Sequence, residues 1–185
     1  MIQRTLILGA LLLSSICAFG QVVPEATAGS APLNVGVFYS FFDSGYASTK
    51  VSGIGTYVDF SPLLSGNLGV EGEARWLMLG TSHSFSEYHY LVGPRYRIYP
   101  GDHFQPYAKF LVGAGEINFP YQLAHGGYFA MAPGGGLEYQ KNGRWKLRID
   151  YEYQIWPDGL GIPGLSKGSV KPNGVSAGIS YRLFR

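Results

Sequence analysis

The sequence has a single cysteine, Cys17, and few charged residues, which make up 14% of the chain. One thiol excludes an intrachain disulfide and a metal site built from several cysteines. The charged fraction is well below the roughly 25% of an ordinary soluble domain. The chain holds 14 Lys and Arg against 12 Asp and Glu, without a basic run, so nucleic acid is not expected as a partner.

Long apolar runs are also missing after residue 20, where no stretch reaches the roughly 20 residues of a membrane-spanning helix. Aromatic residues, by contrast, make up 15% of the chain, and glycine occurs 27 times. Abundant aromatics exclude a disordered chain. The composition also differs from the Ala-, Glu-, Lys- and Leu-rich composition of a coiled coil.

The first 20 residues have the pattern of a secretory signal. Arg4 supplies a positive charge, residues 6–13 are apolar, and Ala18 and Gly20 are small residues at the −3 and −1 positions of a cleavage site. We therefore expect a cleaved signal peptide at 1–20, an N-terminal lead at 21–31 and one folded domain at 32–185.

Apolar and polar residues alternate with period two along much of this domain. In 145–156 the odd positions are aromatic or aliphatic and the even positions from Lys146 to Gln154 are charged or polar, a separation that a strand produces and a helix does not. Eight segments follow this pattern: 33–42, 52–60, 67–78, 86–99, 105–117, 127–140, 145–156 and 172–184.

The segments between these strands predict hairpins. Short turns are expected at 61–67, 100–103 and 141–144, which contain Pro, Asp, Asn and Gly, and longer loops at 43–51, 79–85, 118–126 and 157–171. Strands of about 9–11 residues suit a tilted bilayer crossing, and short turns alternating with long loops are typical of outer-membrane barrels. The prediction is an all-β, eight-stranded antiparallel up-and-down transmembrane β-barrel.

A strand with one charged face fits either a soluble barrel, with the charges outside, or a membrane barrel, with the charges inside. Aromatic residues at both strand ends and a nearly balanced set of charges favour the membrane barrel. The expected lumen ion network consists of Glu71, Glu73, Arg75, Arg95, Arg97, Lys109, Glu138, Arg148, Asp150 and Glu152.

The C-terminal segment 176–184 resembles the terminal strand by which outer-membrane barrels are recognised for insertion, although Arg185 follows the final aromatic. Together with 107–113 and 133–139, it makes residues 32–184 similar to the outer membrane protein β-barrel family, the small OmpA-, OmpX- and OmpW-like barrels. The resemblance implies an insertion signal at Gly178, Tyr181, Leu183 and Phe184. It also implies the outer membrane of a Gram-negative-type envelope, with the N-terminus in the periplasm and the long loops outside.

The expected function is that of a barrel filled by its side chains, with a structural or loop-mediated binding role and at most a narrow pore for small solutes. No cofactor, metal or catalytic residue is predicted. The glycines at 134–136 lack the strand–loop–helix context of a phosphate site. Expected partners are outer-membrane lipid, lipopolysaccharide and the barrel-assembly machinery, with the chain itself a monomer.

Two alternatives stay open. Some small outer-membrane barrels modify lipid A, and a Ser–His–carboxylate set activates a hydroxyl for acyl transfer. The residues that suggest this chemistry are His83, Ser84, Ser86, Glu87 and His89. The second alternative is a soluble lipocalin-like carrier, whose interior would be apolar, although no Gly-x-Trp motif opens the first strand.

Overall fold

The computed structural model describes residues 33–45, 50–60, 67–78, 86–99, 101, 103–118, 125–141, 143–159 and 168–183. The predicted signal peptide at 1–20 and N-terminal lead at 21–31 lie outside the described residues. Within the described residues, no helix is long and apolar enough to cross a membrane. The strands are β1 (Leu33–Asp43), β2 (Lys50–Phe60), β3 (Leu68–Met78), β4 (Ser86–Arg97), β5 (Phe104–Asn118), β6 (His125–Tyr139), β7 (Trp145–Tyr153) and β8 (Asn173–Arg182).

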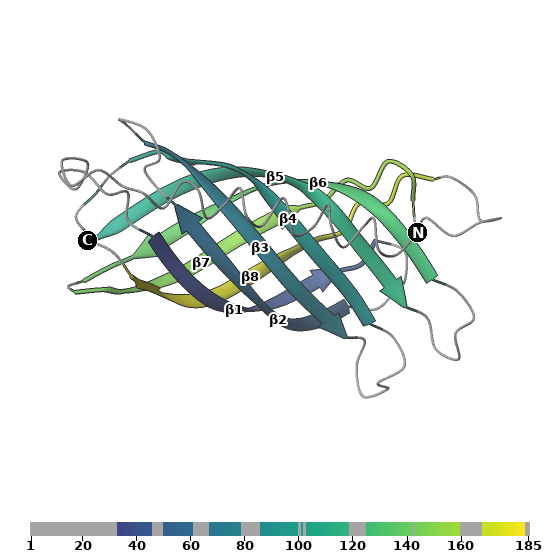
Figure 1. Cartoon of the computed structure of the whole chain (residues 1–185), viewed down its shortest axis with the longest axis horizontal. Coiled ribbons are helices and arrows are strands. Elements are labelled where there is room, and N and C mark those ends of the chain that lie inside the picture. The colour runs from purple at the N-terminus through teal and green to yellow at the C-terminus, as the bar shows by residue number, and fades with distance from the viewer. Residues whose placement is uncertain are drawn as a thin grey trace, which may run out of the picture. The chain divides into compact units, whose positions relative to one another are not determined.

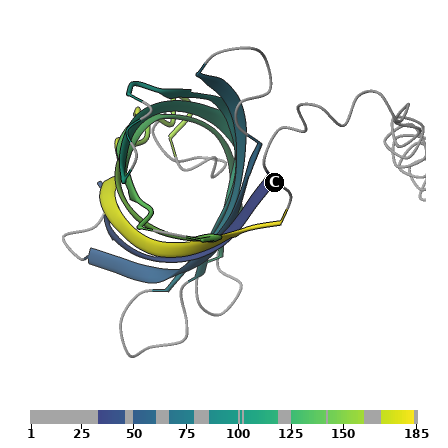
Figure 2. The same cartoon turned by 90° about the vertical axis from the view of Figure 1, so that its left-hand side faces the viewer.

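The eight strands form one closed barrel in which each strand pairs with the next along the chain. All pairs are antiparallel, and β8 returns to β1 to close the ring, as the end-on view in Figure 2 shows. Figure 1 shows the strands running obliquely along the barrel. Closure gives every strand two neighbours, so the ring has no edge strand, which suits a sheet in lipid. The ladder between β6 and β7 covers only residues 134–139 of β6. The predicted eight-stranded antiparallel barrel is confirmed.

Side chains alternate between the lumen and the outer surface as the pleat of a strand requires. In β7, the odd positions from Trp145 to Tyr151 are exposed and the even positions from Lys146 to Glu152 are buried. The same alternation runs along β3, where Glu71, Glu73 and Arg75 are buried. Charged side chains therefore face inward, and the arrangement expected of a soluble carrier is wrong for this chain.

The outer surface carries a belt of large apolar side chains. Val37, Ile54, Val92, Leu147 and Ile149 are all exposed. Aromatic side chains lie toward both ends of this belt, and at one end the rings of Trp145 and Tyr181 meet edge to face with their centroids 4.9 Å apart. An apolar band bordered by aromatic residues is the outer surface of a transmembrane barrel.

We call the end with connections 61–67, 98–103 and 140–144 the short-turn end, and the opposite end the long-loop end. We predicted longer loops at the long-loop end, and only the connection 154–172 is longer than the turns. The other three connections at this end, 44–49, 79–85 and 119–124, are as short as the turns. Two of these connections are shorter than predicted, because pairing reaches Asp43 and Lys50 in β1 and β2, and Asn118 and His125 in β5 and β6.

The strand β7 ends earlier than the predicted 156. Its ladder with β8 stops at Tyr153, opposite Asn173. Pro172, the next residue on the β8 side, has no N–H to donate, and its carbonyl accepts from the N–H of Gln154 at 2.7 Å. The chain then continues through isolated bridges from Ile155 to Met131 and from Trp156 to Val170.

Candidate functional site

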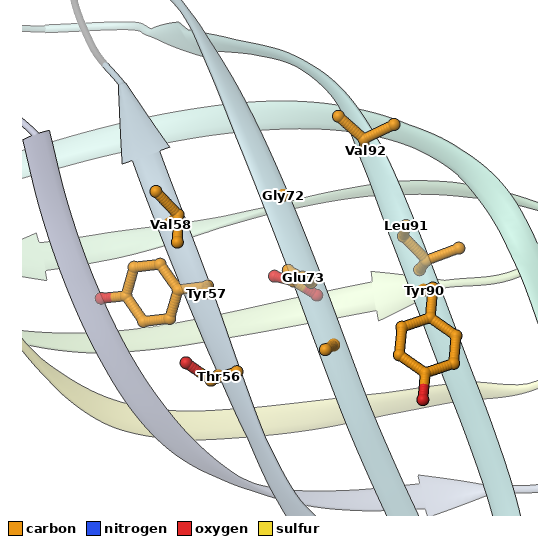
Figure 3. Close-up of a pocket in the computed structure, with 9 residues that line it drawn as sticks. Thr56, Tyr57, Val58, Gly72, Glu73, Tyr90, Leu91 and Val92 are labelled. Atoms are coloured by element: carbon orange, nitrogen blue, oxygen red, sulfur yellow. The ribbon is translucent and has the colours of Figure 1, made fainter. Parts of the chain in front are cut away.

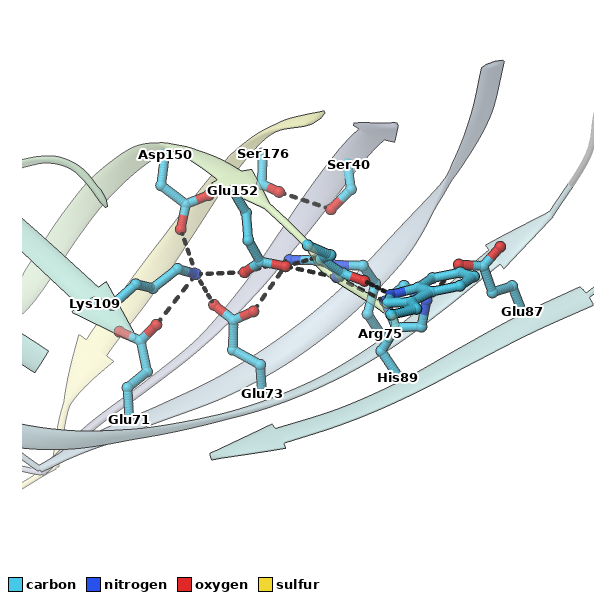
Figure 4. Close-up of polar contacts among 12 residues, drawn as sticks. Ser40, Glu71, Glu73, Arg75, Glu87, His89, Lys109, Asp150, Glu152 and Ser176 are labelled. Atoms are coloured by element: carbon cyan, nitrogen blue, oxygen red, sulfur yellow. Dashed lines mark hydrogen bonds and ion pairs between the residues drawn. The ribbon is translucent and has the colours of Figure 1, made fainter. Parts of the chain in front are cut away.

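The middle of the lumen is organised around the ammonium group of Lys109, on β5. Four carboxylates from two other strands surround its Nζ atom (Figure 4). Their distances are 2.5 Å for Glu73, 2.9 Å for Asp150, 3.0 Å for Glu152 and 3.5 Å for Glu71. Because Lys109 is only 4% exposed, these carboxylates take the place of water around the cation.

Arg148, on β7, contacts three of these carboxylates, those of Glu71, Glu73 and Asp150. Its guanidinium donates two parallel hydrogen bonds to Glu71, of 2.7 and 2.8 Å, and further bonds of 2.6 Å to Asp150 and 3.0 Å to Glu73. It also lies over the ring of Tyr57, 4.2 Å from the centroid. The bidentate geometry suits the planar guanidinium and fixes the distance between β3 and β7 across the lumen.

Toward the short-turn end, the network continues through Arg95, on β4. Its guanidinium contacts Asp59 at 2.5 Å and Glu138 at 2.8 Å. Glu138 in turn accepts a 3.0 Å hydrogen bond from Lys146, and Asp59 accepts one of 3.1 Å from Asn34. The two cations and two carboxylates therefore form a second group of ion pairs, next to the first.

Toward the long-loop end, a chain of polar side chains leaves the network at Glu152. Arg75 donates to Glu152 at 2.8 Å, and so does the amide of Gln154. The same amide nitrogen lies 3.1 Å from Nδ1 of His89, whose Nε2 contacts the carboxylate of Glu87. Both ring nitrogens of His89 are thus engaged, with the proton on Nε2 in this arrangement.

An apolar group fills the lumen beside this chain. We call it the apolar plug: Phe42, Val51, Leu77, Leu91, Leu111, Ile117, Tyr128, Ala130, Ala132 and Trp156. The rings of Tyr128 and Trp156 stack with centroids 3.8 Å apart, and the Trp156 indole donates to Oε1 of Gln154 at 2.8 Å. The plug extends to the long-loop end of β1, β2, β3 and β5, where Phe42, Val51, Leu77 and Ile117 lie.

The structure brings nine of the ten predicted lumen residues into ion pairs with one another. They are Glu71, Glu73, Arg75, Arg95, Lys109, Glu138, Arg148, Asp150 and Glu152, which we call the ion lattice. Arg97 is the exception. It is half-buried near the short-turn end of β4, and no ion pair joins it to another described residue.

Sequence reasoning missed three kinds of lumen residue. Asp59 lies on the inward phase of β2, beside Tyr57, and this alternation is the signal that identifies it. Leu77 and Ile117 are also in phase with buried charges, but their apolar character gave no sign of a plug. Gln154 and Trp156 are buried on the inward phase of β7, which continues beyond the end of its ladder with β8.

Of the residues suggested for acyl transfer that the structure describes, only the side chains of Glu87 and His89 are in contact. Glu87 and His89 are buried in the lumen, whereas Ser86 precedes them on the outward phase of β4. His83 and Ser84 lie outside the described residues. Among the residues that the structure covers, no group of three His, Cys, Asp or Glu side chains is placed to hold a metal ion.

The predicted insertion residues lie on or next to β8. Gly178 pairs with Phe38 and Arg148, Tyr181 pairs with Val35 and Trp145, and the N–H of Leu183 donates to the carbonyl of Leu33 at 2.8 Å. Phe184 lies outside the described residues. Their role in insertion stays a prediction.

Comparison with known proteins gives one family. The model of the outer membrane protein beta-barrel domain matches residues 8–182. No curated protein matches the sequence.

Solved structures share the fold. Neisserial surface protein A (NspA) is 11% identical, with a TM-score of 0.63 over 84% of this chain and 98% of its own. The attachment invasion locus protein Ail of Yersinia pestis is 18% identical, with a TM-score of 0.53 over 83% and 97%. OprG of Pseudomonas aeruginosa is 12% identical, with a TM-score of 0.52 over 84% and 97%. At these identities, the likeness concerns the fold alone.

Proposed function

The chain belongs to the outer membrane protein β-barrel domain family, and from this premise we propose that it is a closed barrel, which holds its outer loops in place and conducts no steady ion current. The observation that carries the proposal is the filled lumen. The ion lattice joins strands on opposite walls, and the apolar plug occupies the lumen beside it. An eight-stranded barrel has an interior just wide enough to be filled by side chains.

The energetic argument is that a permeating ion needs a path of water or of polar groups free to coordinate it. In the ion lattice, Lys109 and Arg148 already engage the carboxylates of Glu71, Glu73 and Asp150. Opening such a path requires the separation of buried ion pairs, which costs several kcal/mol for each charge left without a partner. The stack of Tyr128 and Trp156 adds an apolar obstacle.

Planar-bilayer recording of the purified, folded protein tests this proposal. We expect no steady conductance from the unaltered chain. We also expect none from Trp156→Ala, because the ion lattice persists when the plug is weakened. A large porin in the same bilayer provides the positive control. Steady single-channel currents from the unaltered chain would overturn the proposal.

We also propose that the lumen has no enzymatic role. His89 is the buried histidine of this region, and Glu87 and Gln154 engage its two ring nitrogens. A histidine that activates a nucleophile needs a hydroxyl or thiol at one of these nitrogens. Binding through the outer loops is the function that this barrel supports best.

For the orientation, we propose that the short-turn end faces the periplasm and the long-loop end faces outward. The even number of strands supports this arrangement, since both ends of the barrel chain meet where Leu183 bonds to Leu33. A cleaved signal peptide before β1 would leave the new N-terminus in the periplasm. The 154–172 connection, the longest in the barrel, would then be extracellular.

Cysteine labelling of intact cells tests the orientation. Asp158→Cys and Arg144→Cys place a thiol at exposed positions on opposite ends of the barrel, and Cys17 falls in the predicted signal peptide. A membrane-impermeant maleimide is expected to label the first variant and not the second, while both react after lysis. The reverse pattern would show that the orientation is inverted.

Three further expectations stay proposals: contact with lipopolysaccharide, insertion by the barrel-assembly machinery and a monomeric state. The apolar belt supports a lipid environment, and Gly178 and Tyr181, two residues of the predicted insertion signal, lie on β8.

A further inference from the structure

Two arginines at the short-turn end of the lumen lack a carboxylate partner among the described residues. Arg97 is the last residue of β4, and Arg182 is the last residue of β8. Both are half-buried on the inward phase of their strands, and no ion pair joins either one to a described residue. A charge that is partly withdrawn from water is costly unless it is paired. These two guanidinium groups are therefore charges that the described barrel does not neutralise.

The strand order places the two arginines on opposite walls. Three strands separate β4 from β8 in either direction around the ring, which Figure 2 views from this end. The N–H of Arg97 donates to the carbonyl of Asn67, just before β3, and Arg182 stands opposite Asn34, near the start of β1. The charge of Arg182 acts on that of Arg97 across the opening. We call this opening, with Arg97 and Arg182 on its two sides, the cationic mouth.

The nearest carboxylates do not offset these two charges. Asp59 contacts Arg95 at 2.5 Å, and Glu138 contacts Arg95 at 2.8 Å and Lys146 at 3.0 Å. Both carboxylates thus already neutralise other cations. Four cations against two carboxylates leave two positive charges at this end of the lumen. The described inward residues in this count are Arg95, Arg97, Lys146, Arg182, Asp59 and Glu138.

The guanidinium of Arg182 also has a donor without an acceptor. Its Nη2 atom donates to Oε1 of Gln140 at 3.0 Å. Its Nε atom is buried and has no hydrogen-bond partner. A buried donor that stays unsatisfied costs about 1–3 kcal/mol, more when the group is charged. An oxygen from outside the described chain would remove this cost.

The cationic mouth is closed on its inner side. The guanidinium of Arg95 lies over the ring of Tyr107, 3.9 Å from the centroid, and 3.6 Å from the carboxylate of Glu71 in the ion lattice. Since Asp59 and Glu138 hold it as well, Arg95 cannot turn toward the mouth without losing these contacts. A ligand of the two free arginines therefore enters from the short-turn end.

A hollow in the outer wall provides a contrast. It has a volume of about 370 Å³ and lies over Gly72, between the side chains of Val58 and Val92 (Figure 3). The side chains of this hollow that lie on the outward phase are uncharged, and the apolar belt surrounds them. Fluid lipid chains suffice to fill such a surface, whereas the cationic mouth requires an anion.

We propose that the cationic mouth binds a phosphate monoester between Arg97 and Arg182. The planar fork of a guanidinium donates two parallel hydrogen bonds to the oxygens of a phosphate group. A phosphate monoester carries about −1.5 to −2 charges at pH 7, which matches the two positive charges left at this end. The buried Nε–H of Arg182 gains its missing acceptor. In the orientation proposed above, the mouth opens to the periplasm.

The phosphate monoester has two possible sources, a soluble ester and a lipid such as phosphatidic acid. Both arginines lie on the inward phase, and lipid contacts the outward phase, so their position favours a soluble ester. A phosphodiester, the linkage of most phospholipid head groups, carries one negative charge and would offset only half of the excess. The proposal requires neither a sealed lumen nor a particular orientation.

A titration of the full folded chain in an uncharged detergent tests the proposal. Glycerol 3-phosphate is added at constant ionic strength against sodium chloride, and the arginine Nε–H signals are followed by NMR. We expect saturable shifts of the signals of Arg97 and Arg182. Arg97→Gln and Arg182→Gln should each weaken binding about tenfold, because each removes charge-assisted hydrogen bonds. Arg144→Gln, at the same end, should leave the affinity unchanged, since Arg144 is exposed and directed at the ring of Tyr181.

A second titration, with phosphatidic acid in the same micelles, separates the two sources. Shifts with glycerol 3-phosphate identify a soluble ester, and shifts with phosphatidic acid alone identify a lipid head group. Heat-dependent mobility on gels checks that each variant folds, and the signals of the unaltered chain report on the site without any variant. The proposal is overturned if neither ligand gives saturable shifts, if both arginine variants bind as tightly as the unaltered chain, or if Arg144→Gln weakens binding as much as they do. None of these results bears on the conductance of the lumen, so the two proposals fail separately.

Discussion

Replacement of Lys109 by methionine is expected to lower the free energy of unfolding by about 3–5 kcal/mol. The ammonium group lies within 3.0 Å of an oxygen of Glu73, Asp150 and Glu152, and all three carboxylates are buried. Methionine fills a similar volume without a charge. The variant therefore keeps the packing of the lumen and leaves the carboxylates with less compensating charge than they need.

Denaturant unfolding in phospholipid vesicles, followed by tryptophan fluorescence, measures this effect. Arg144→Met, which removes an exposed cation at the short-turn end, is the control and should change stability by less than about 0.5 kcal/mol. Adding Glu73→Gln to Lys109→Met should restore part of the loss, since it removes one of the uncompensated charges. If Lys109→Met is as stable as the unaltered chain, the lattice is not a desolvated network.

The second large effect is expected on the outer surface. Ile149→Arg should cost about 2–4 kcal/mol, the range for an arginine on the lipid face at the bilayer midplane. Ile149 is 60% exposed and is the central residue of β7. Its outward neighbours in the register, Leu137 and Ala177, offer no partner for a guanidinium.

Depth in the membrane provides the control for this variant. Val70 is also exposed, but it lies opposite Phe60, the last residue of β2, at the short-turn end. Val70→Arg should therefore cost less, about 0–1 kcal/mol, because the guanidinium reaches the interface. Equal costs at both positions, measured by the same unfolding experiment, would be inconsistent with a hydrocarbon layer centred on the middle of β7.

Local patterns predicted most of the barrel wall. The alternation from Trp145 to Glu152 identifies the inward and outward residues without any knowledge of the fold, because the pleat turns successive side chains to opposite faces. Most predicted strand boundaries differ from the observed ones by no more than two residues. The larger error, at the end of β7, arose where pairing changes partner rather than where the pattern stops.

Such local patterns could not predict the contacts across the lumen. Arg148 and Glu71 are 77 residues apart, and only the closure of the barrel brings them to 2.7 Å. Arg97 has the same inward phase as Arg95, yet its place near the end of β4 leaves it outside the lattice. Trp156 is buried beyond the end of β7, and its bridge to Val170 spans the longest connection.

The sequence by itself determined which side chains face lipid and which face the lumen, because alternation is a property of the backbone within each strand. Tertiary structure alone decided which charges meet, where the apolar plug lies and how Arg97 and Arg182 come to stand on opposite sides of one opening. These contacts depend on the stagger between strands and on the meeting of β1 with β8, and no stretch of sequence encodes either one locally.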